Sequence, residues 1–388
     1  MNPRNIISTT VLFALLAGNS AIEFASAQTW MQTSAPSNAW QSVATSADGV
    51  NLVAVVNPGA IYISTNSGSN WNPTANSQLS HLNWQSVASS ADGSKLLAAP
   101  QSGSLYNSTN SGVTWIRQTN LPIVSWSSVA ISGSGNKWFA FSQQMYISSD
   151  SGATWTTNNL PYQYGGGAVV SADGNTVAFG RSGYPALIYT STNVGATWVT
   201  NSMPFYIMGM ALSADGLKLA VACLDGGILT STNSGNTWEA TTAPNIPWRA
   251  IASSADGNVL LATENYGSDG STFYSTNAGL TWVSNNTPNL HWTSLASSAD
   301  GNKLFAAASG PIYSRVIAPE PRLNFQASDG IGTLSWIIPS AAFAVQESAD
   351  LLNWADRPGV PTVNLDALRV ELSVPTTGEK RFFRLRLQ

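Results

Sequence analysis

The sequence predicts an all-β protein: a seven-bladed β-propeller that is closed by its N-terminal strand and followed by a small β-sandwich. The first observation behind this prediction is an octapeptide close to Ser-Thr-Asn-Ser-Gly-x-Thr-Trp, which occurs six times at intervals of 40 to 44 residues. The second is a motif close to Ser-Ala-Asp-Gly, which alternates with the octapeptide and occurs seven times. The third is a charged fraction of only 9% in 388 residues, with Asn, Ser, Thr and Gly gathered in clusters typical of turns.

The first residues of the chain resemble a cleavable export signal that spans residues 1–27. Arg4 provides the positive charge, residues 6–17 form a short apolar stretch, and residues 25–27 form a small-residue cleavage site. We therefore expect a protein that is secreted, periplasmic or attached to the cell surface. No later stretch reaches 18 consecutive apolar residues, so we expect no integral membrane segment after cleavage.

The charge and the cysteine content argue against several further classes. A formal net charge of −4 favours neither nucleic acid nor an anionic membrane surface as a partner. Cys223 is the only cysteine, so an internal disulfide is excluded and stability has to come from packing. We expect no cofactor.

Each repeat contains four short runs, which we expect to be the four strands of a propeller blade. In one repeat they are residues 84–89, residues 96–99, residues 105–106 and a run opened by Trp115. No repeat holds an 11-residue window with the 3.6-residue period of a helix, which excludes helical solenoids. The propeller is predicted to span residues 28–317.

The seventh repeat ends without an octapeptide and without a fourth strand. The missing part lies at the other end of the chain, because residues 29–40 match residues 237–248 almost position for position. We therefore expect the mature N-terminus to add the outer strand of the last blade. This pairing joins the first and last blades and removes an open sheet edge.

The octapeptide resembles the Asp-box, or BNR, repeat of sialidases and of many non-catalytic propellers. Its role is then structural: Ser and Asx accept hydrogen bonds from turn amides, Gly permits positive φ, and Trp packs under the blade. Only Asp150 keeps the family's Asp, and the Asn of the other five octapeptides supplies no charge, so we expect no metal ion. The structural residues are Trp71, Trp115, Asp150, Trp155, Trp198, Trp238 and Trp282.

A second set of tryptophans begins the innermost strand of five repeats. In propeller geometry these positions lie near the central channel, at the face opposite the octapeptides. Two interpretations are open: an aromatic ring that stacks on sugars or on a partner's side chains, or packing between blades. The five residues are Trp40, Trp84, Trp126, Trp248 and Trp292.

Charged residues outside the repeat pattern concentrate in the fourth to sixth repeats, in loops between second and third strands or at the start of the inner strand. Two of these loops are enlarged and carry a tyrosine. We expect them to open on the tryptophan-bearing face as a candidate binding face; the alternative is that the charges only keep a charge-poor protein in solution. The candidate residues are Arg181, Tyr184, Asp225, Arg249, Glu264, Tyr266 and Asp269.

The residues argue against an enzyme. Sialidases hold the substrate carboxylate with three arginines, but the propeller has only four, and Arg117 and Arg315 fall on strands away from the candidate face. The sialidase arginine triad is therefore absent. Asp225, Glu264 and Asp269 can supply the carboxylate pair of another glycoside hydrolase, although nothing in their spacing is specific.

The repeat length, the octapeptide and the Trp-x-Ser-Val/Leu-Ala opening of the inner strand resemble the photosystem II assembly factor group and its bacterial BNR-like relatives. The resemblance covers about residues 28–316. It implies an exported, non-enzymatic propeller that serves as a protein-binding or assembly scaffold. The alternative is a carbohydrate-binding or carbohydrate-active extracellular protein, so the expected partner is an unidentified protein or polysaccharide at the cell envelope.

The repeats stop near Arg315, and residues 318–322 form a short Pro-containing linker. In residues 323–388, alternating runs separated by Gly, Pro and Asp turns predict a small β-sandwich that resembles Ig-like or fibronectin type III-like modules. We expect Trp336 and Trp354 in its core and the last run as an edge strand; the alternative for this run is a surface-attachment or secretion signal. The five runs are residues 323–327, 333–338, 343–347, 368–374 and 381–387.

Overall fold

The computed structural model describes residues 30–158, 165–181, 183, 185–265, 270–285, 287–317, 323–328, 331–338, 343–350, 352–375 and 381–387. In this part of the chain the only helix is the 3-10 helix η1 (Ser77–Leu79), and all other regular elements are strands, which confirms the all-β prediction. None of the described residues belongs to a helix long and apolar enough to cross a bilayer. The predicted export signal and the predicted linker lie outside the described residues.

Five sheets contain four antiparallel strands each, in chain order. The first sheet is formed by β6 (Trp84–Ser89), β7 (Leu96–Pro100), β8 (Tyr106–Ser108) and β9 (Ile116–Arg117). The second is formed by β10 (Ser128–Ile131), β11 (Trp138–Phe141), β12 (Met145–Ser148) and β13 (Thr156–Asn158), and the third by β14 (Gly165–Val170), β15 (Val177–Arg181), β16 (Ala186–Ser191) and β17 (Val199–Met203). The fourth is formed by β18 (Ile207–Leu212), β19 (Leu219–Cys223), β20 (Ile228–Ser231) and β21 (Glu239–Ala240), and the fifth by β22 (Trp248–Ser253), β23 (Leu260–Glu264), β24 (Thr272–Ser275) and β25 (Val283–Asn285).

A sheet of eight strands combines two further groups, one from each end of the repeat region. The first group is β2 (Asn38–Thr45), β3 (Leu52–Val56), β4 (Ile61–Ser64) and β5 (Asn72–Pro73). The last group is β26 (Trp292–Ser297), β27 (Lys303–Gly310) and β28 (Ile312–Val316), together with the N-terminal strand β1 (Met31–Gln32). Since β2 also pairs with β27, the two ends of the repeat region are hydrogen-bonded to each other.

The N-terminal strand completes the last group, as the sequence predicts, because β1 pairs antiparallel with β28. Trp30, just before β1, is 8% exposed, and its ring centroid lies 6.5 Å from that of Trp292. The octapeptide residue Trp282 has the same relation to Trp248 in the fifth four-stranded sheet, at 6.3 Å. Trp30 therefore takes the place of the octapeptide tryptophan that the last repeat lacks.

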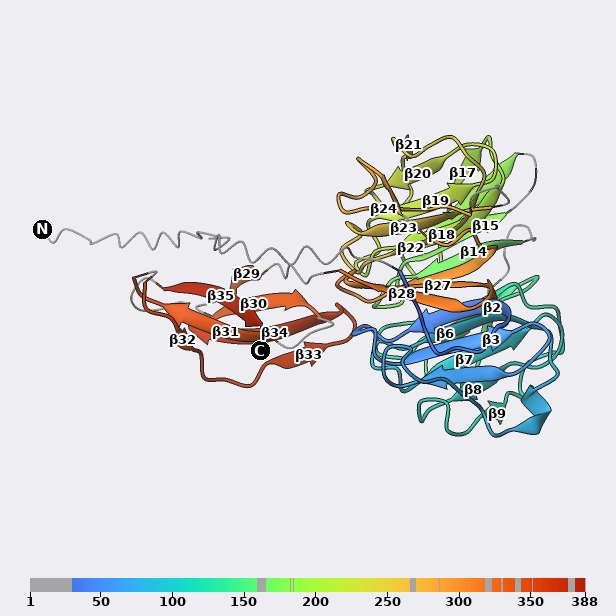
Figure 1. Ribbon diagram of the computed structural model, residues 1–388, viewed down its shortest axis with the longest axis horizontal. Coiled ribbons are helices and arrows are strands. Elements are labelled where there is room, and N and C mark those ends of the chain that lie inside the picture. Colours follow the sequence, from blue (N-terminus) through green and yellow to red (C-terminus); the bar gives the residue numbers. More distant parts are fainter. Residues whose placement is uncertain are drawn as a thin grey trace, which may run out of the picture.

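The groups of strands form a closed circle around a central channel. The first strand of each group contacts the first strand of the next, and β26 contacts β2. The turn after each first strand donates a backbone hydrogen bond to the equivalent turn of the next group, at N–O distances of 2.7 to 2.9 Å. These bonds close into the turn ring, which consists of Ala47, Ala91, Gly133, Ala172, Ala214, Ala255 and Ala299. This is the arrangement of a β-propeller (Figure 1).

The antiparallel strand order gives the channel two different ends. The turn ring and the octapeptides lie at one end, called the ring end below. The first strands begin at the other end, where the second strands also finish, and this is called the loop end.

Repeated lysines connect neighbouring groups at the ring end. Lys303 Nζ donates to the backbone oxygen of Asp48 at 3.2 Å and to Ser67 Oγ at 3.1 Å, so it links the last group to the first. Three other lysines reach the next group in the same way; they are Lys95, Lys137 and Lys218. These residues, which belong to the repeat in the sequence, therefore act between repeats.

The octapeptide turns share one hydrogen-bond pattern. In the second octapeptide, Ser108 Oγ accepts from the Gly112 amide and Asn110 Oδ1 accepts from the Thr114 amide, both at 2.9 Å. The same two bonds recur in the other five octapeptides. Gly112 has φ 84, and Ser111 before it has φ 56. The Asn carbonyl thus closes the turn without a charge.

Residues 324–387 contain two antiparallel sheets that share one core, called the C-terminal sheet pair below. One sheet has the order β29 (Asn324–Ser328), β30 (Ile331–Ile337), β34 (Arg369–Pro375), β33 (Thr362–Asn364), and the other has the order β32 (Ala355–Asp356), β31 (Phe343–Ser348), β35 (Phe382–Leu387). Trp336 is 2% exposed in the core, and β35 is an edge strand, as predicted. The sequence missed β32 and β33, because two or three residues are too few to show alternation.

The prediction that Trp354 is a core residue is wrong. Its side chain is only half-buried, and the guanidinium of Arg384 lies 4.2 Å from its ring centroid. Arg384 alternates along β35 with Phe383 and Leu385, which pack against the core. Trp354 therefore lies on the outer face of its sheet, where its ring stacks against a cation.

Candidate functional site

The five inner-strand tryptophans are buried inside the propeller, with exposed fractions of 0 to 2%. Each ring meets an aromatic ring of the third strand of its own group edge-on, at centroid distances of 5.1 to 5.8 Å. The pairs are Trp40 with Tyr62, Trp84 with Tyr106, Trp126 with Tyr146, Trp248 with Phe273, and Trp292 with Tyr313. Edge-on packing of this kind stabilises a core.

In three of these tryptophans, Trp84, Trp126 and Trp292, the indole N–H donates to a backbone oxygen of the preceding group. Trp84 Nε1 donates to Gly59 O at 3.0 Å, and Trp126 Nε1 donates to Gly103 O at 2.9 Å. Both acceptors lie in loops between second and third strands. Rings held in this way present no face to a sugar, so the geometry favours the packing interpretation over an aromatic binding ring.

Four of the charged candidate residues lie at the loop end of three consecutive groups. Arg181 ends β15 and Glu264 ends β23. Asp225 follows β19, and Arg249 is the second residue of β22. The first strands of these groups contact one another in order, β14 with β18 and β18 with β22. The topology therefore brings the four residues to the same end of neighbouring sheets.

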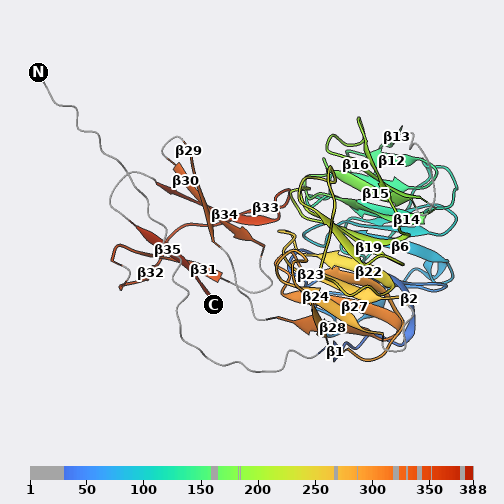
Figure 2. The same cartoon turned by 90° about the horizontal axis from the view of Figure 1, so that it is seen from above.

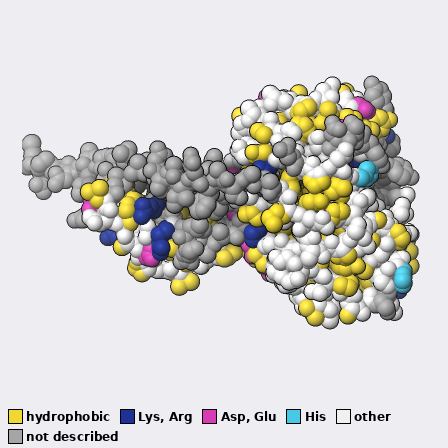
Figure 3. All heavy atoms as spheres, in the orientation of Figure 1, with side chains coloured by type: hydrophobic (Ala, Val, Ile, Leu, Met, Phe, Trp, Pro, Cys, Tyr) yellow, Lys and Arg dark blue, Asp and Glu magenta, His cyan; other side chains and the backbone are white. Residues whose placement is uncertain are grey.

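Three of these charges have no polar partner among the described residues. Within the part of the chain that the structure describes, the side chains of Asp225, Arg249 and Glu264 form no hydrogen bond and no ion pair. Asp225 is exposed, and the other two are half-buried. On the face drawn in Figure 3 the propeller surface is mostly uncharged, so isolated charges at one end are distinctive.

Arg249 occupies a β-bulge that recurs at the loop end. The register between β22 and β23 shifts between Trp248 and Ala250, which leaves Arg249 as the extra residue. A bulge re-aims the side chain that it carries. The equivalent residues of four other first strands are uncharged; they are Gln41, Gln85, Met208 and Thr293. The bulge is not among the features predicted from the sequence, where its signal is the variable residue in the Trp-x-Ser opening.

Three other candidate residues, Tyr184, Tyr266 and Asp269, lie outside the described residues. They belong to the loops that follow β15 and β23, whose second-strand ends carry Arg181 and Glu264. Their assignment to the candidate face stays a prediction from the sequence.

The other two propeller arginines lie on strands, as predicted. Arg117 ends the outer strand β9, where its Nε donates to Ser104 Oγ at 2.9 Å. Arg315 is 6% exposed on β28 and lies over the Tyr274 ring, 4.5 Å from its centroid. Both guanidinium groups therefore contact their own or neighbouring strands and are not part of the loop-end set.

Hydrogen bonds within a turn or burial in the core explain the shifted pKa values of two propeller residues, Asp150 and Cys223. Hydrogen bonds from the Thr154 hydroxyl and amide lower the pKa of Asp150 to about 2, so this octapeptide carboxylate stays ionised. Burial, with a smaller effect of the Asp225 charge, raises the pKa of the Cys223 thiol to about 12, which makes it unreactive. Among the described residues no group of His, Cys, Asp and Glu side chains could hold a metal ion.

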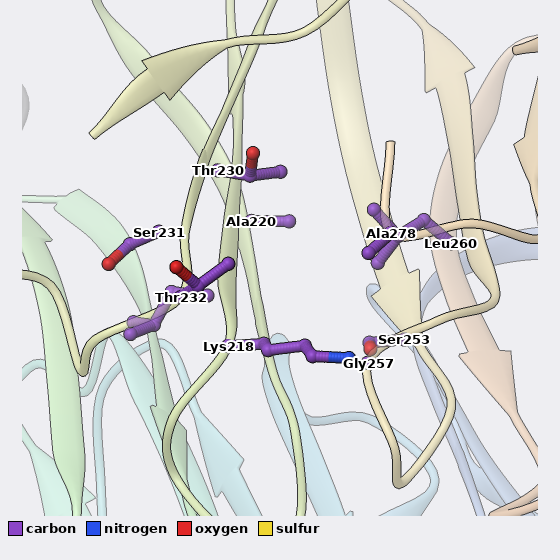
Figure 4. A pocket seen from close by; sticks show the side chains of 10 residues that line it. Lys218, Ala220, Thr230, Ser231, Thr232, Ser253, Gly257, Leu260 and Ala278 are labelled. Atoms are coloured by element: carbon purple, nitrogen blue, oxygen red, sulfur yellow. The ribbon is translucent and has the colours of Figure 1, made fainter. Parts of the chain in front are cut away.

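A crevice between the fourth and fifth four-stranded sheets is a seam and not a binding site (Figure 4). Its volume is about 10 Å³, at the lower limit for a single water molecule. Lys218 crosses the seam, and its Nζ donates to Asp256 O at 2.9 Å and to Asn258 Oδ1 at 2.8 Å.

Comparison with solved structures identifies the fold. No protein-family model matches the sequence, and a search of curated proteins gave no match. YCF48 from Cyanidioschyzon merolae superposes with a TM-score of 0.59 at 14% identity, over 74% of this chain and 98% of that one. YCF48 bound to D1 peptide gives 0.60 at 16% identity, over 74% and 95%. The GH74 xyloglucanase from Xanthomonas campestris gives 0.60 at 16% identity, over 80% of this chain and 59% of that one. These likenesses confirm the predicted propeller.

Proposed function

We propose that this chain is an exported, seven-bladed propeller without catalytic activity that binds a protein partner at its loop end. In this proposal the C-terminal sheet pair is an Ig-like or fibronectin type III-like sandwich. The observation that carries the proposed binding function is the set of charged side chains at the loop end, Asp225, Arg249 and Glu264, which the fold leaves without partners among the described residues.

The chemistry of the loop end supports a polypeptide ligand. Charges of both signs lie on neighbouring groups of strands, and such mixed surfaces recognise partners by electrostatic complementarity. The fold is also compatible with peptide binding, because a solved propeller of similar structure is YCF48 bound to D1 peptide. The count of seven blades is supported by the seven members of the turn ring. Export is supported by the N-terminal signal in the sequence.

Two observations support a role without catalysis. The arginines do not assemble into the group of three that a sialidase needs, since Arg117 and Arg315 contact strands elsewhere. A glycoside hydrolase needs a carboxyl group that stays protonated by burial or by a neighbouring carboxylate. Asp225 is exposed at the loop end and therefore lacks the burial that such an acid needs.

Carbohydrate is the second candidate ligand. The observation that favours it is the similar fold of the GH74 xyloglucanase. A sugar would have to be bound by the loop-end charges and by the tyrosines of the enlarged loops, because the five inner tryptophans are buried.

The test is a parallel screen of residues 28–388 against a displayed peptide library and a glycan array. The discriminating variant is Arg249→Gln, and its matched control is Arg117→Gln, which removes an exposed arginine from the outer strand β9. We expect peptide ligands whose affinity falls at least about tenfold in Arg249→Gln and less than about twofold in the control.

Two outcomes contradict the proposal. Saturable glycan binding without any peptide ligand would move the function to carbohydrate recognition. Peptide binding that both arginine variants weaken equally would show that the loop end is not the contact surface.

A further inference from the structure

Gly133 is the one member of the turn ring that is not alanine. Its backbone makes the same ring hydrogen bonds as the others: its amide donates to Ala172 O at 2.7 Å and its carbonyl accepts from the Ala91 amide at 2.9 Å. Gly133 does not have the positive φ that favours glycine. The ring itself therefore does not require glycine at this position, and another contact has to explain it.

The turn between β33 and β34 supplies that contact. A Cβ atom added to Gly133 would lie 2.0 Å from the backbone oxygen of Leu365 and 3.0 Å from its carbonyl carbon. The nearest propeller atom would be Ala172 O, at 3.2 Å. Because the obstacle is backbone, it cannot move aside by a change of rotamer. An alanine at position 133 is therefore incompatible with the observed position of the turn between β33 and β34.

Apolar side chains of the C-terminal sheet pair cover the turn ring around this contact. Ile338 is buried in one cluster with Ala47 and Ala299, and Leu365 and Leu368 pack against the same cluster. Figures 1 and 2 both show β33 on the side of the sheet pair that faces the propeller. The contact is therefore a packed apolar interface and not a single touching atom.

Leu368 lies at the mouth of the channel. It borders a cavity of about 160 Å³ whose other walls come from the first strands and the turn ring. Leu368 has φ 50, a conformation that residues with a side chain rarely adopt. Its carbonyl accepts from the Ile338 amide at 2.9 Å, and the neighbouring Ala367 amide donates to Asn364 Oδ1 at 3.0 Å. These bonds hold the turn in the shape that brings both leucines to the ring.

We propose that the turn ring is the receptor surface for the chain's own C-terminal sheet pair, and that Gly133 determines this docking. The sheet pair then caps the ring end of the channel. This inference does not rest on the proposed function, because it concerns the opposite end of the channel.

The test is Gly133→Ala in the full chain. This substitution restores the alanine that the other six ring members carry, so the repeat itself tolerates it. The matched control is Gly167→Ala, which adds the same methyl group to β14 at a place with no atom within 4 Å. The natural chain and both variants receive a site-specific protease sequence within residues 318–322, are cut there, and are passed through a size-exclusion column.

We expect the two parts of the natural chain and of Gly167→Ala to elute together after cutting, and those of Gly133→Ala to separate, with a dissociation constant raised at least about tenfold. Leu368→Asp, which changes the other side of the interface, is expected to separate as well. Thermal unfolding of the uncut chains checks that the propeller of Gly133→Ala still folds. Peptide binding at the loop end is expected to be unchanged in Gly133→Ala, so the two proposals fail independently.

Co-elution of the Gly133→Ala parts, at a level equal to the natural chain, would overturn the proposal. Separation of the natural parts, or of the Gly167→Ala control, would overturn it equally, because the ring would then not hold the sheet pair or the effect would not be specific to position 133.

Discussion

The residues at the ring end of the channel keep the repeated sequence more strictly than the residues at the loop end. At the ring end six of the seven ring members are alanine, and lysines from four repeats reach the next group of strands. At the loop end the bulge position changes from repeat to repeat, and Arg249 carries the charge that its counterparts lack. The comparison teaches that positions shared by the repeats hold the groups together, while the positions that differ are the ones to which we assign contact surfaces.

The two ends differ because their residues form different numbers of hydrogen bonds with the neighbouring groups of strands. A ring member donates to one turn and accepts from another, so a change disturbs two groups of strands. Among the described residues, a loop-end side chain such as Glu264 makes no hydrogen bond or ion pair to either neighbouring group. Gly133, the exception at the ring end, is explained by a contact from outside the repeats.

The largest effect is expected for Trp248→Ala. Trp248 is fully buried, lies edge-on to Phe273, and its Nε1 donates to Pro244 O at 3.2 Å. Its removal leaves a large cavity, and we expect the free energy of unfolding to fall by about 3–5 kcal/mol. Urea denaturation followed by circular dichroism measures this loss.

Trp354→Ala is the control for Trp248→Ala, because Trp354 is half-buried and stacks with Arg384 on the outer face of its sheet. We expect it to cost less than about 1 kcal/mol. If Trp248→Ala proved equally mild, the inner tryptophans would not be core residues, and an aromatic binding ring would again be the better interpretation.

An intermediate effect is expected for Lys303→Met, which tests the ring end. Methionine keeps the apolar stem but removes the two hydrogen bonds to Asp48 O and Ser67 Oγ that link the last group to the first. We expect a loss of about 1–2 kcal/mol in the free energy of unfolding, measured by urea denaturation. No loss at all would mean that the lysine links are incidental to closure.

Most of the propeller could be predicted from the sequence, because the same pattern of short runs and turns recurs in each repeat. The partner of the incomplete last repeat was found by matching residues 29–40 to residues 237–248, and β1 indeed pairs with β28. The strands β32 and β33 were missed because nothing repeats them and they are too short to alternate. Trp354 was misplaced because composition does not say which face of a single strand is inside.

The sites were harder to predict than the fold. Arg249 and Glu264 stood out as charges outside the repeat, but the bulge that presents Arg249 appears only in the register of β22 with β23. The sequence shows that the third repeat departs from the Ser-Ala-Asp-Gly motif at residues 133 and 134, but it does not show why. The structure explains Gly133 by its contact with Leu365, and no local sequence pattern connects these two residues.

The smallest effect is expected for Glu264→Ala, which tests the loop end directly. Its side chain is half-buried at the end of β23 and has no hydrogen bond or ion pair within the described residues. We expect the free energy of unfolding to change by less than about 0.5 kcal/mol, since no hydrogen-bonded or ion-paired partner among the described residues is lost. The same urea denaturation as for Lys303→Met measures it. A loss above about 2 kcal/mol would place Glu264 among the residues that hold the fold. The charges of the loop end would then be structural, and the difference between the two ends of the channel would no longer mark where a partner binds.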